Sequence, residues 1–272
     1  MLVLRCAYFG AKYHGFQIQP DVPTIQGEII NSLIKIGIKH NIRYASRTDA
    51  GVSAVDQILL VNISDPSVVQ LLNQNLPNEI KIHSFSLLNN FSFSQILYKE
   101  YLYVAPKFIV DINVLNKAIE FMNGIRLNYI HLIKKPSQVS LSDVLMRIHI
   151  NIKKDQSNLY FYVKSKKFLW EQVRRLVNCL LAVGLGRISL DTFKLILHGK
   201  PYPSGIPPAP PEGLILWRTK TPVDDKFIEL TPRRKIEEWV LSSVKRAIMS
   251  SKWTLPPIDR RLKSSYFRNQ IL

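Results

Sequence analysis

The hydrophobic positions in the first third of the chain follow two periods, one of two residues and one of three to four. Segments that alternate or hold β-branched runs are expected to be strands, at 2–8, 55–63 and 79–87. Segments with apolar residues on one helical face are expected to be helices, at 24–38 and 67–75. Thr24 can cap the first of these helices, because its hydroxyl can accept from an exposed N–H group. We therefore expect an alternating α/β domain over residues 1–92.

The same alternation resumes after a polar joint at Asn89 and Asn90. Further strands are expected at 98–104, 143–153, 159–165 and 213–219. Further helices are expected at 113–123, 170–183 and 189–197. Six prolines make residues 200–211 an extended connector before the last strand, which could be ordered or mobile. These elements predict a second α/β domain over residues 93–219.

The remaining residues, 220–272, are expected to form a basic and partly helical extension. A helical pattern covers residues 236–249. The cations of the extension include Arg233, Arg234, Lys235, Lys245, Arg246, Lys252, Arg260, Arg261, Lys263 and Arg268. Two alternatives remain open, because such a segment could clamp RNA or could be a solvated helix that packs on its own domain.

The charge balance indicates the kind of partner. The chain holds 37 Lys and Arg against 20 Asp and Glu, which gives a net charge of +17. Such a surplus favours a polyanion, and nucleic acid is the leading candidate. An anionic membrane surface is the competitor, but the cations are dispersed and form no single amphipathic helix. With 46% hydrophobic residues, the composition excludes a disordered protein.

The sequence gives no sign of a membrane span, a secretion signal or a metal site. Its longest apolar runs, such as residues 176–185, are shorter than the ~18 residues that a span needs. Residues 1–9 alternate like a strand and lack the zones of a signal peptide. Cys6 and Cys179 have no metal-ligand spacing and are expected to be buried thiols. We expect a cytoplasmic protein with no membrane association, disulfide or metal.

Candidate chemistry begins with a turn-forming run from Ser46 to Val52. Gly51 can adopt backbone angles that other residues avoid, and Thr48 and Asp49 can bond to nearby backbone, so we expect a tight loop. An aspartate is ionised at neutral pH, so Asp49 could act as a nucleophile or a base. Taken alone, the run is more typical of a capped and solvated turn.

The helix expected at 170–183 carries two adjacent arginines that a helical wheel separates. Arg175 lies one turn after Glu171, with which it can form an exposed ion pair. Arg174 lies beside the apolar face, where a guanidinium needs an anionic partner. That partner could be Asp49, or Arg174 could instead extend to the rim of the face.

The strand expected at 98–104 places Lys99, Tyr101 and Tyr103 on one face, because side chains alternate along a strand. Two tyrosines beside a cation suit stacking on an unpaired base and contact with a phosphate. The alternative is a strand whose tyrosines line the core, and this segment alone favours it.

Taken in order, these segments resemble the signature motifs of the tRNA pseudouridine synthase A (TruA) family. The matching runs are Tyr8-Phe9-Gly10-Ala11-Lys12-Tyr13-His14-Gly15-Phe16-Gln17, Thr24-Ile25-Gln26-Gly27-Glu28, Arg47-Thr48-Asp49-Ala50-Gly51-Val52, Lys99-x-Tyr101-x-Tyr103, Phe168 to Val177, and Pro211-Glu212-Gly213-Leu214. Ordered matches over residues 1–219 are much more specific than any single one.

The chain departs from the family pattern at a few positions. Ser46 stands where the family usually has glycine, and Phe9 stands where it usually has aspartate. The family's His/Asn-Ala/Pro-Arg element before the tyrosine strand is replaced by Phe91-Ser92-Phe93-Ser94. This last departure concerns an RNA contact and not the chemistry. Residues after 219 have no counterpart in the compact bacterial pattern.

The resemblance implies an α+β fold. In it, two ferredoxin-like α/β halves form a continuous, mixed, mainly antiparallel sheet with flanking helices and a central active-site cleft. It also implies a homodimer and an isomerase that converts uridine in tRNA to pseudouridine. An isomerisation with no redox change and no group donor needs no cofactor, in agreement with the lack of Rossmann, P-loop and metal motifs.

The resemblance also implies a role for each motif residue. Asp49 is the essential carboxylate, Tyr101 stacks on the uracil and helps to move its proton, and Arg174 pairs with Asp49. The residues expected to bind substrate are Arg47, Thr48, Lys99, Tyr103 and Arg175. Among them, Arg47 would occupy or steady the place that the extruded nucleotide leaves.

The family's target is the anticodon stem-loop region, commonly uridines 38 to 40 in tRNA numbering, whereas some relatives modify positions 27 and 28. A noncatalytic RNA-binding relative is the main rival, because basic charge and stacking tyrosines would survive the loss of activity. Asp49-Ala50-Gly51 also bears a superficial likeness to the dimeric aspartic proteases. Their site uses a hydroxyl that Ala50 lacks.

Overall fold

A computed structural model describes residues 1–39, 41–107, 110–134, 139–251, 253–254 and 256–258. The chain forms two compact units. Unit 1 holds Met1–Leu102 and Pro211–Lys252, and unit 2 holds Tyr103–Pro210 and Trp253–Leu272, as far as these ranges are described. Within the described ranges, no helix is both long and apolar enough to cross a membrane. Cys6 and Cys179 are free and buried, as expected.

Unit 1 is built on a sheet of mainly antiparallel strands. Its strands are β1 (Leu2–Tyr8), β2 (Ile42–Tyr44), β3 (Ser53–Val61), β4 (Ile80–Leu87), β10 (Leu214–Lys220) and β11 (Ile228–Glu229). They are hydrogen-bonded in the order β11-β4-β1-β3-β10, and β2 also pairs with β3. The β3 and β10 pair is parallel, whereas β1 is antiparallel to both of its neighbours. Every residue of β1 and β3 is buried, as in central strands that are covered on both faces.

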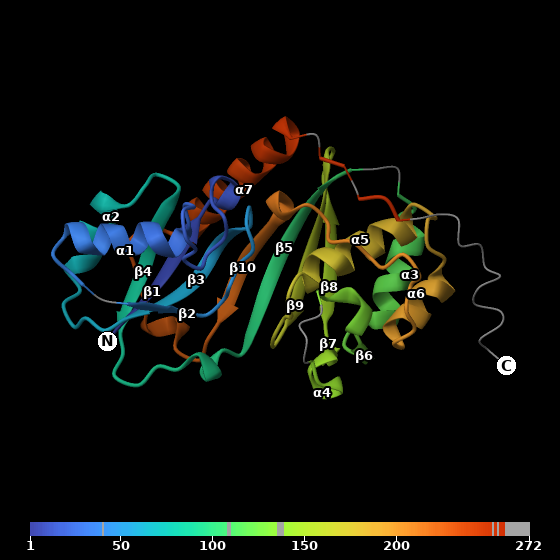
Figure 1. The fold of residues 1–272 in the computed structure, drawn as a ribbon, viewed down its shortest axis with the longest axis horizontal. Coiled ribbons are helices and arrows are strands. Elements are labelled where there is room, and N and C mark those ends of the chain that lie inside the picture. The colour runs from blue at the N-terminus through green and yellow to red at the C-terminus, as the bar shows by residue number, and fades with distance from the viewer. Residues whose placement is uncertain (40, 108–109, 135–138, 252, 255, 259–272) are drawn as a thin grey trace. The chain divides into compact units, whose positions relative to one another are not determined.

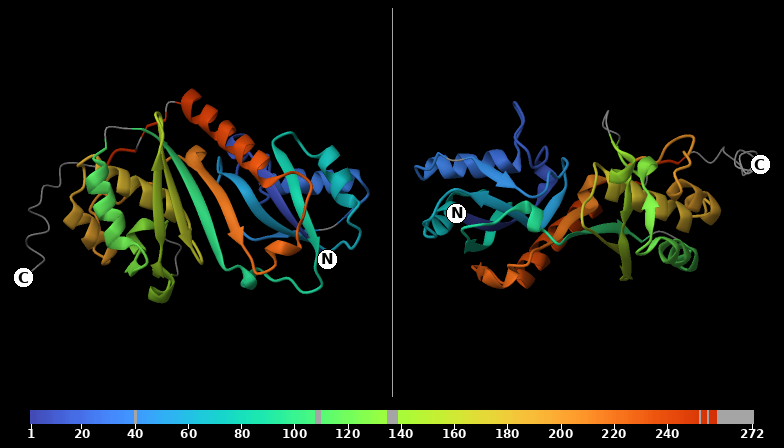
Figure 2. Two further views of the ribbon diagram at one scale, coloured as in Figure 1. Left: turned by 180° about the vertical axis from the view of Figure 1, so that it is seen from behind. Right: turned by 90° about the horizontal axis from the view of Figure 1, so that it is seen from below.

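Helices cover both faces of this sheet. They are α1 (Ile25–Lys35), α2 (Val68–Asn75) and α7 (Arg233–Ser250). In Figures 1 and 2, α1 and α2 lie on one face of the unit 1 strands and α7 lies on the other. Thr24 caps α1 as expected, because its Oγ1 accepts a hydrogen bond from the Gly27 N–H at 3.2 Å.

The packing of α7 bears on the two alternatives for the basic extension. Ile236, Val240 and Val244 of α7 are buried, and the helix contacts β3 and β1. The described part of the extension therefore packs on its own unit. The cations of the extension that lie outside the described residues are Lys252, Arg260, Arg261, Lys263 and Arg268.

Unit 2 combines a hairpin, a small two-stranded sheet and a helical cluster. Its strands are β6 (Arg126–Asn128), β7 (Leu145–Arg147), β8 (His149–Lys154) and β9 (Asn158–Ser165), and β5 (Tyr98–Pro106) enters it from unit 1. Its helices are α3 (Ile112–Met122), α4 (Leu141–Val144), α5 (Gln172–Gly184) and α6 (Leu190–Leu197). Strands β8 and β9 pair antiparallel, as do β6 and β7. Helices α3, α5 and α6 pack against one another beside the hairpin (Figure 1).

Short 3-10 turns connect these elements. They are η1 (Gly10–Lys12), η2 (Phe93–Gln95), η3 (Ile130–Leu132), η4 (Pro211–Gly213) and η5 (Asp224–Lys226). Both units thus mix helices with mainly antiparallel strands, which confirms the expected α+β class.

The compact units do not follow the expected ranges 1–92, 93–219 and 220–272. Strand β10 belongs to unit 1 because Ile215 and Leu216 pair with β3. Helix α7 belongs there because its apolar face packs on the same sheet. A parallel pairing between segments about 160 positions apart leaves no local pattern in the sequence. The sequence therefore could not show that β10 joins the sheet of unit 1.

Candidate active site

Asp49 lies in a tight loop between β2 and β3 of unit 1. The loop closes through a hydrogen bond from the Val52 N–H to the Asp49 carbonyl at 3.2 Å. Gly51 has φ +80°, a conformation that favours glycine, so the expected tight loop is confirmed. Arg47 is exposed, Thr48 is buried and Asp49 is half-buried. The loop therefore exposes the Arg47 side chain to solvent and buries that of Thr48.

The N-terminal motif encloses this loop from a second side. The Phe16 N–H donates to the Thr48 carbonyl at 3.1 Å, and the Gly51 N–H donates to the Tyr13 carbonyl at 3.2 Å. The Tyr8 hydroxyl lies 2.8 Å from the Thr48 Oγ1, with both groups buried. Thr48, expected to bind substrate, is therefore engaged in positioning the loop.

Two glycines of the N-terminal motif are required by their close approach to the loop. A Cβ on Gly10 would lie 2.0 Å from the Val52 carbonyl oxygen, so this position has no room for a side chain. Gly15 has φ +98°, and a Cβ there would lie 3.0 Å from the Thr48 carbonyl oxygen. The first motif and the aspartate motif are thus two halves of one packed structure.

Gln57 of β3 fixes the first residue of the loop, and sequence reasoning missed it. The Ser46 N–H donates to the Gln57 Oε1 at 3.0 Å, while the Gln57 Nε2 donates to the Ser46 carbonyl at 2.5 Å. Both residues are buried. The signal that could have found Gln57 is an uncharged polar residue inside a strand of apolar residues, since buried polar groups need partners.

Lys99 of β5 supports the same loop from a third side. Its Nζ donates to the Ala45 carbonyl at 2.6 Å. Burial lowers the pKa of Lys99 to about 8, because desolvation disfavours the ammonium form. In this structure Lys99 contacts the loop backbone, where the sequence predicts contact with substrate.

Tyr101, two residues further along β5, lies within the electrostatic reach of Asp49. Burial raises the pKa of Tyr101 to about 12, and the negative charge of Asp49 acts in the same direction. The phenol is therefore protonated at neutral pH. Asp49 and Tyr101 belong to the same unit.

In unit 2, helix α5 uses its polar residues to hold the proline-rich connector. Arg174 Nε donates to the Ala209 carbonyl at 2.6 Å, and the Ala209 N–H donates back to the Arg174 carbonyl at 3.1 Å. Arg175 Nη1 donates to the Ile206 carbonyl at 2.6 Å, and Asn178 Nδ2 donates to Pro207 at 2.7 Å. The connector is thus ordered along α5. Its proline content alone did not decide between an ordered and a mobile segment.

Arg175 and Tyr103 are engaged inside unit 2. Arg175 forms the expected ion pair with Glu171 at 2.6 Å, but the two side chains are only 20% and 13% exposed, so the pair is not the exposed one predicted. Tyr103 is fully buried, and its hydroxyl donates to the Pro210 carbonyl at 2.8 Å. Tyr103 is 0% exposed, whereas Tyr101 keeps 9% of its surface exposed, so Tyr103 has no face for an RNA base and instead supports the connector.

The predicted site residues thus fall into two sets. Unit 1 brings together Arg47, Thr48, Asp49, Lys99 and Tyr101, and unit 2 brings together Tyr103, Arg174 and Arg175. Among the residues that the structure describes, no group of three His, Cys, Asp or Glu side chains could hold a metal ion.

Comparison with known proteins shows which class this α+β protein belongs to. A family profile described as tRNA pseudouridine synthase matches residues 133–222. The tRNA pseudouridine synthase A of Archaeoglobus fulgidus is 31% identical over 228 residues, which cover 83% of this chain and 84% of the relative. That of Pyrococcus horikoshii is 32% identical over 259 residues, covering 91% and 97%. That of Thermococcus kodakarensis is 33% identical over 263 residues, covering 91% and 96%.

The chain belongs to the tRNA pseudouridine synthase A family and is an isomerase. The profile match includes α5 and its arginines but not the Asp49 loop. The relatives cover far more of the chain than the profile does.

Proposed function

We propose that this enzyme isomerises uridine in the anticodon stem-loop region of tRNA, at positions 38 to 40 in tRNA numbering. The observation that carries the proposed reaction is the fixed Asp49 loop with Tyr101 in the same unit, and the family resemblance of the motifs supports the proposed positions. Hydrogen bonds from the N-terminal motif, Gln57 and Lys99 hold that loop from three sides. A carboxylate on so constrained a backbone is preorganised for one reaction geometry.

The reaction conserves atoms, and Asp49 is its proposed nucleophile or base. The bond from uracil N1 to ribose C1′ breaks, the base turns, and a bond from C5 to C1′ forms. N1 gains a proton and C5 loses one, so no group donor is needed. Asp49 begins the reaction either by attack on C1′ or by removal of the 2′ proton, and both routes require its ionised form.

Arg174 is proposed to pair with Asp49 during the reaction. Its position beside the apolar face of α5 supports this, because a guanidinium there needs an anion. Its Nε is committed to Ala209, which fixes the direction of the side chain. An arginine held in this way loses little further freedom when it meets a carboxylate.

Tyr101 is proposed to stack on the flipped uracil, and Arg47 to occupy the place that the uracil leaves. A base must leave its stack before the enzyme can act on it, at a cost of a few kcal/mol. Stacking on an aromatic ring returns about 1–3 kcal/mol of that cost. The exposure of Arg47 supports its role, because only a side chain that reaches solvent can enter an RNA helix.

The remaining proposals concern assembly and location. The net charge of +17 supports binding of tRNA through its phosphates, read by shape and backbone across a homodimer. The cytoplasm is the proposed compartment. Lys99 and Arg175 are proposed to act on RNA through the loop and the connector that they hold.

Transcripts of one tRNA that differ in a single uridine test the proposed position. The set places uridine at position 38, 39 or 40, or at 27 or 28, and pseudouridine is mapped by carbodiimide labelling and primer extension. The proposal predicts modification at 38 to 40 and none at 27 and 28. Modification confined to positions 27 and 28 would overturn the proposed position while leaving the isomerase activity established.

A further inference from the structure

Trp170, two residues before the first residue of α5, is unusual among the aromatic side chains of this protein. It is 50% exposed, whereas every other aromatic residue in the described ranges is buried or only partly exposed. A tryptophan in water is costly, because its large apolar surface gains from burial. Its position, four residues before Arg174 in the sequence, places this exposed ring within the Phe168 to Val177 motif.

Hydrogen bonds hold the turn that carries Trp170. The Leu169 N–H donates to the Gln172 Oε1 at 2.9 Å, and the Gln172 N–H donates to the Leu169 carbonyl at 3.2 Å. The Lys134 N–H donates to the Trp170 carbonyl at 2.9 Å. The ring is therefore presented to solvent by an ordered backbone, as a preorganised contact residue should be.

Glu171, next to the tryptophan, adopts a strained conformation. Its φ is +58°, in the left-handed region that residues other than glycine rarely occupy. Its carboxylate is held by Arg175 at 2.6 Å and by Lys134 at 3.8 Å. Such strain persists only where surrounding contacts impose it, and it is concentrated at functional positions.

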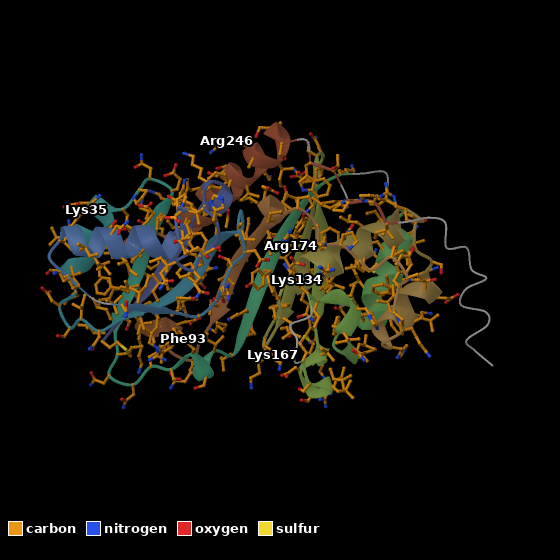
Figure 3. The ribbon with its side chains drawn as sticks, in the orientation of Figure 1. Lys35, Phe93, Lys134, Lys167, Arg174 and Arg246 are labelled. Carbon is orange, nitrogen blue, oxygen red and sulfur yellow. The ribbon has the colours of Figure 1, made fainter. Side chains whose placement is uncertain are left out.

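A cation accompanies the ring. The Lys134 Nζ lies 4.1 Å from the centre of the Trp170 ring, and its side chain is 49% exposed. Lys166 and Lys167, which are both exposed, come shortly before Trp170 in the chain. In the view of Figure 3, Lys134 and Arg174 lie near each other, whereas Lys167 lies apart from them and pairs with Asp143 at 2.7 Å. An exposed aromatic ring with a lysine beside it is an arrangement that can recognise an unpaired nucleotide.

A protein partner fits this surface less well. In the described part of unit 2, the exposed large hydrophobic residues are Ile125, Leu141 and Trp170. Neither Ile125 nor Leu141 is close to Trp170 in the sequence. The core of a protein interface usually gathers several apolar side chains with few charges. A single exposed ring beside a lysine is instead typical of a surface for nucleic acid.

We propose that Trp170 and Lys134 form a nucleotide-binding site for the tRNA substrate. Trp170 stacks on an unpaired base that flanks the target uridine, and Lys134 binds a phosphate of the same nucleotide. The inference rests on the proposed function and adds a contact outside the motif residues already assigned. Glu171 keeps the ring in place through its backbone conformation, and Arg175 is the positioning residue behind it.

The ring is tested with an anticodon stem-loop RNA and three full-length variants. Trp170→Ala removes the stacking surface, Trp170→Phe retains an aromatic ring, and Leu141→Ala is the control for an exposed apolar residue in the same unit. We expect Trp170→Ala to raise the Kd about tenfold. Trp170→Phe and Leu141→Ala should stay close to the wild type. Binding should also quench tryptophan fluorescence in the wild type and much less in Trp170→Phe.

The cation is tested by the salt dependence of the same Kd. Lys134→Gln should lower the slope of log Kd against log salt by about one phosphate contact. Lys117→Gln, which removes an exposed lysine from α3, should leave the slope unchanged. Sedimentation of each variant, without RNA, measures whether Trp170 belongs to an interface between two copies of the chain.

The outcomes separate the inference from the function on which it rests. Wild-type affinity in Trp170→Ala together with full fluorescence quenching in Trp170→Phe would overturn the inference. The isomerase activity itself would still be established by tritium release from tRNA labelled at uracil C5. A change in oligomeric state with unchanged RNA affinity would also overturn it, in favour of a protein interface. Absence of tritium release by the wild type would instead contradict the proposed function.

Discussion

At the scale of single residues, the site depends on how Asp49 and Tyr101 are held. Sequence motifs single out both residues as candidates, because each stands in a short run whose order and spacing are specific. The motifs could not predict that Thr48, Lys99 and Tyr103 are engaged with protein groups. Such partners come from other segments of the chain, and a single sequence does not show which segments meet.

Substitution of Tyr101 by phenylalanine tests the protonation state of the phenol. Because the pKa of Tyr101 is raised to about 12, the phenol does not titrate between pH 7 and 9. In Tyr101→Phe we expect a single-turnover rate that is lower by about 100-fold, as for loss of a proton-transfer group, with unchanged RNA affinity. The shape of the pH profile over this range should match that of the wild type. A rising limb that is present in the wild type and lost in the variant would contradict this assignment.

At the scale of elements, strand and helix periods predicted most of the fold. Strand 2–8 matches β1 at both ends, whereas the helix predicted over 24–38 ends at Lys35. Strand β2 was not predicted, because three residues are too few to show a period. The order of the proline connector was also beyond prediction, since it depends on side chains of α5 that are distant in sequence.

The packing of the N-terminal motif against the aspartate loop gives a prediction for Gly10. A methyl group there would overlap the Val52 carbonyl, so Gly10→Ala must displace one of the two motifs. We expect a loss of about 2 kcal/mol in the free energy of unfolding, as for overpacking, together with reduced activity. Urea denaturation and tritium release measure the two effects.

Gly37→Ala is the matched control for Gly10→Ala. Gly37 has φ +82° and nothing within 4 Å of an added Cβ, so the substitution brings only backbone strain. A loss of roughly 1 kcal/mol with full activity is expected there. If Gly10→Ala were as stable and as active as Gly37→Ala, the loop would not depend on this close approach.

At the scale of the whole molecule, unit 1 buries a network of charges that the sequence did not reveal. Asp56 accepts from Arg5 at 2.5 Å, from Arg233 at 3.1 Å and from the Thr219 N–H at 2.9 Å. The carboxylate is fully buried, and its pKa is lowered because the guanidinium charges outweigh the cost of desolvation. Arg233 is thus one cation of the extension whose role is to fasten α7 to β3.

His83, beside this network, predicts how stability depends on pH. Burial lowers the pKa of His83 to about 4, helped by Arg233 and Arg5 and opposed by Asp56. Between pH 6.5 and 4, His83 is therefore protonated in the unfolded chain but neutral in the folded protein. The free energy of unfolding thus falls as the pH falls through this window. The lowered pKa of Asp56 acts only below its ordinary range, so the two effects are separable.

Urea denaturation at pH 7.5 and at pH 5.0 measures the contribution of His83. The wild type should lose about 2 kcal/mol between these values from His83 alone. The His83 Nε2 lies 3.0 Å from the Val55 carbonyl, and a glutamine could also donate to that oxygen. His83→Gln should therefore lose about 2 kcal/mol less on acidification. Equal losses in the two proteins would show that His83 is not the acid-sensitive group.

The role of Asp49 as the reacting carboxylate is the central claim, and tritium release from tRNA labelled at uracil C5 tests it most directly. The wild type should release tritium with no added metal or cofactor, and Asp49→Ala should release none while it still binds the RNA with an affinity that falls steeply with salt. Asp225→Ala, which removes an exposed carboxylate from unit 1, should release tritium as the wild type does. Release by Asp49→Ala at the wild-type rate would contradict the claim.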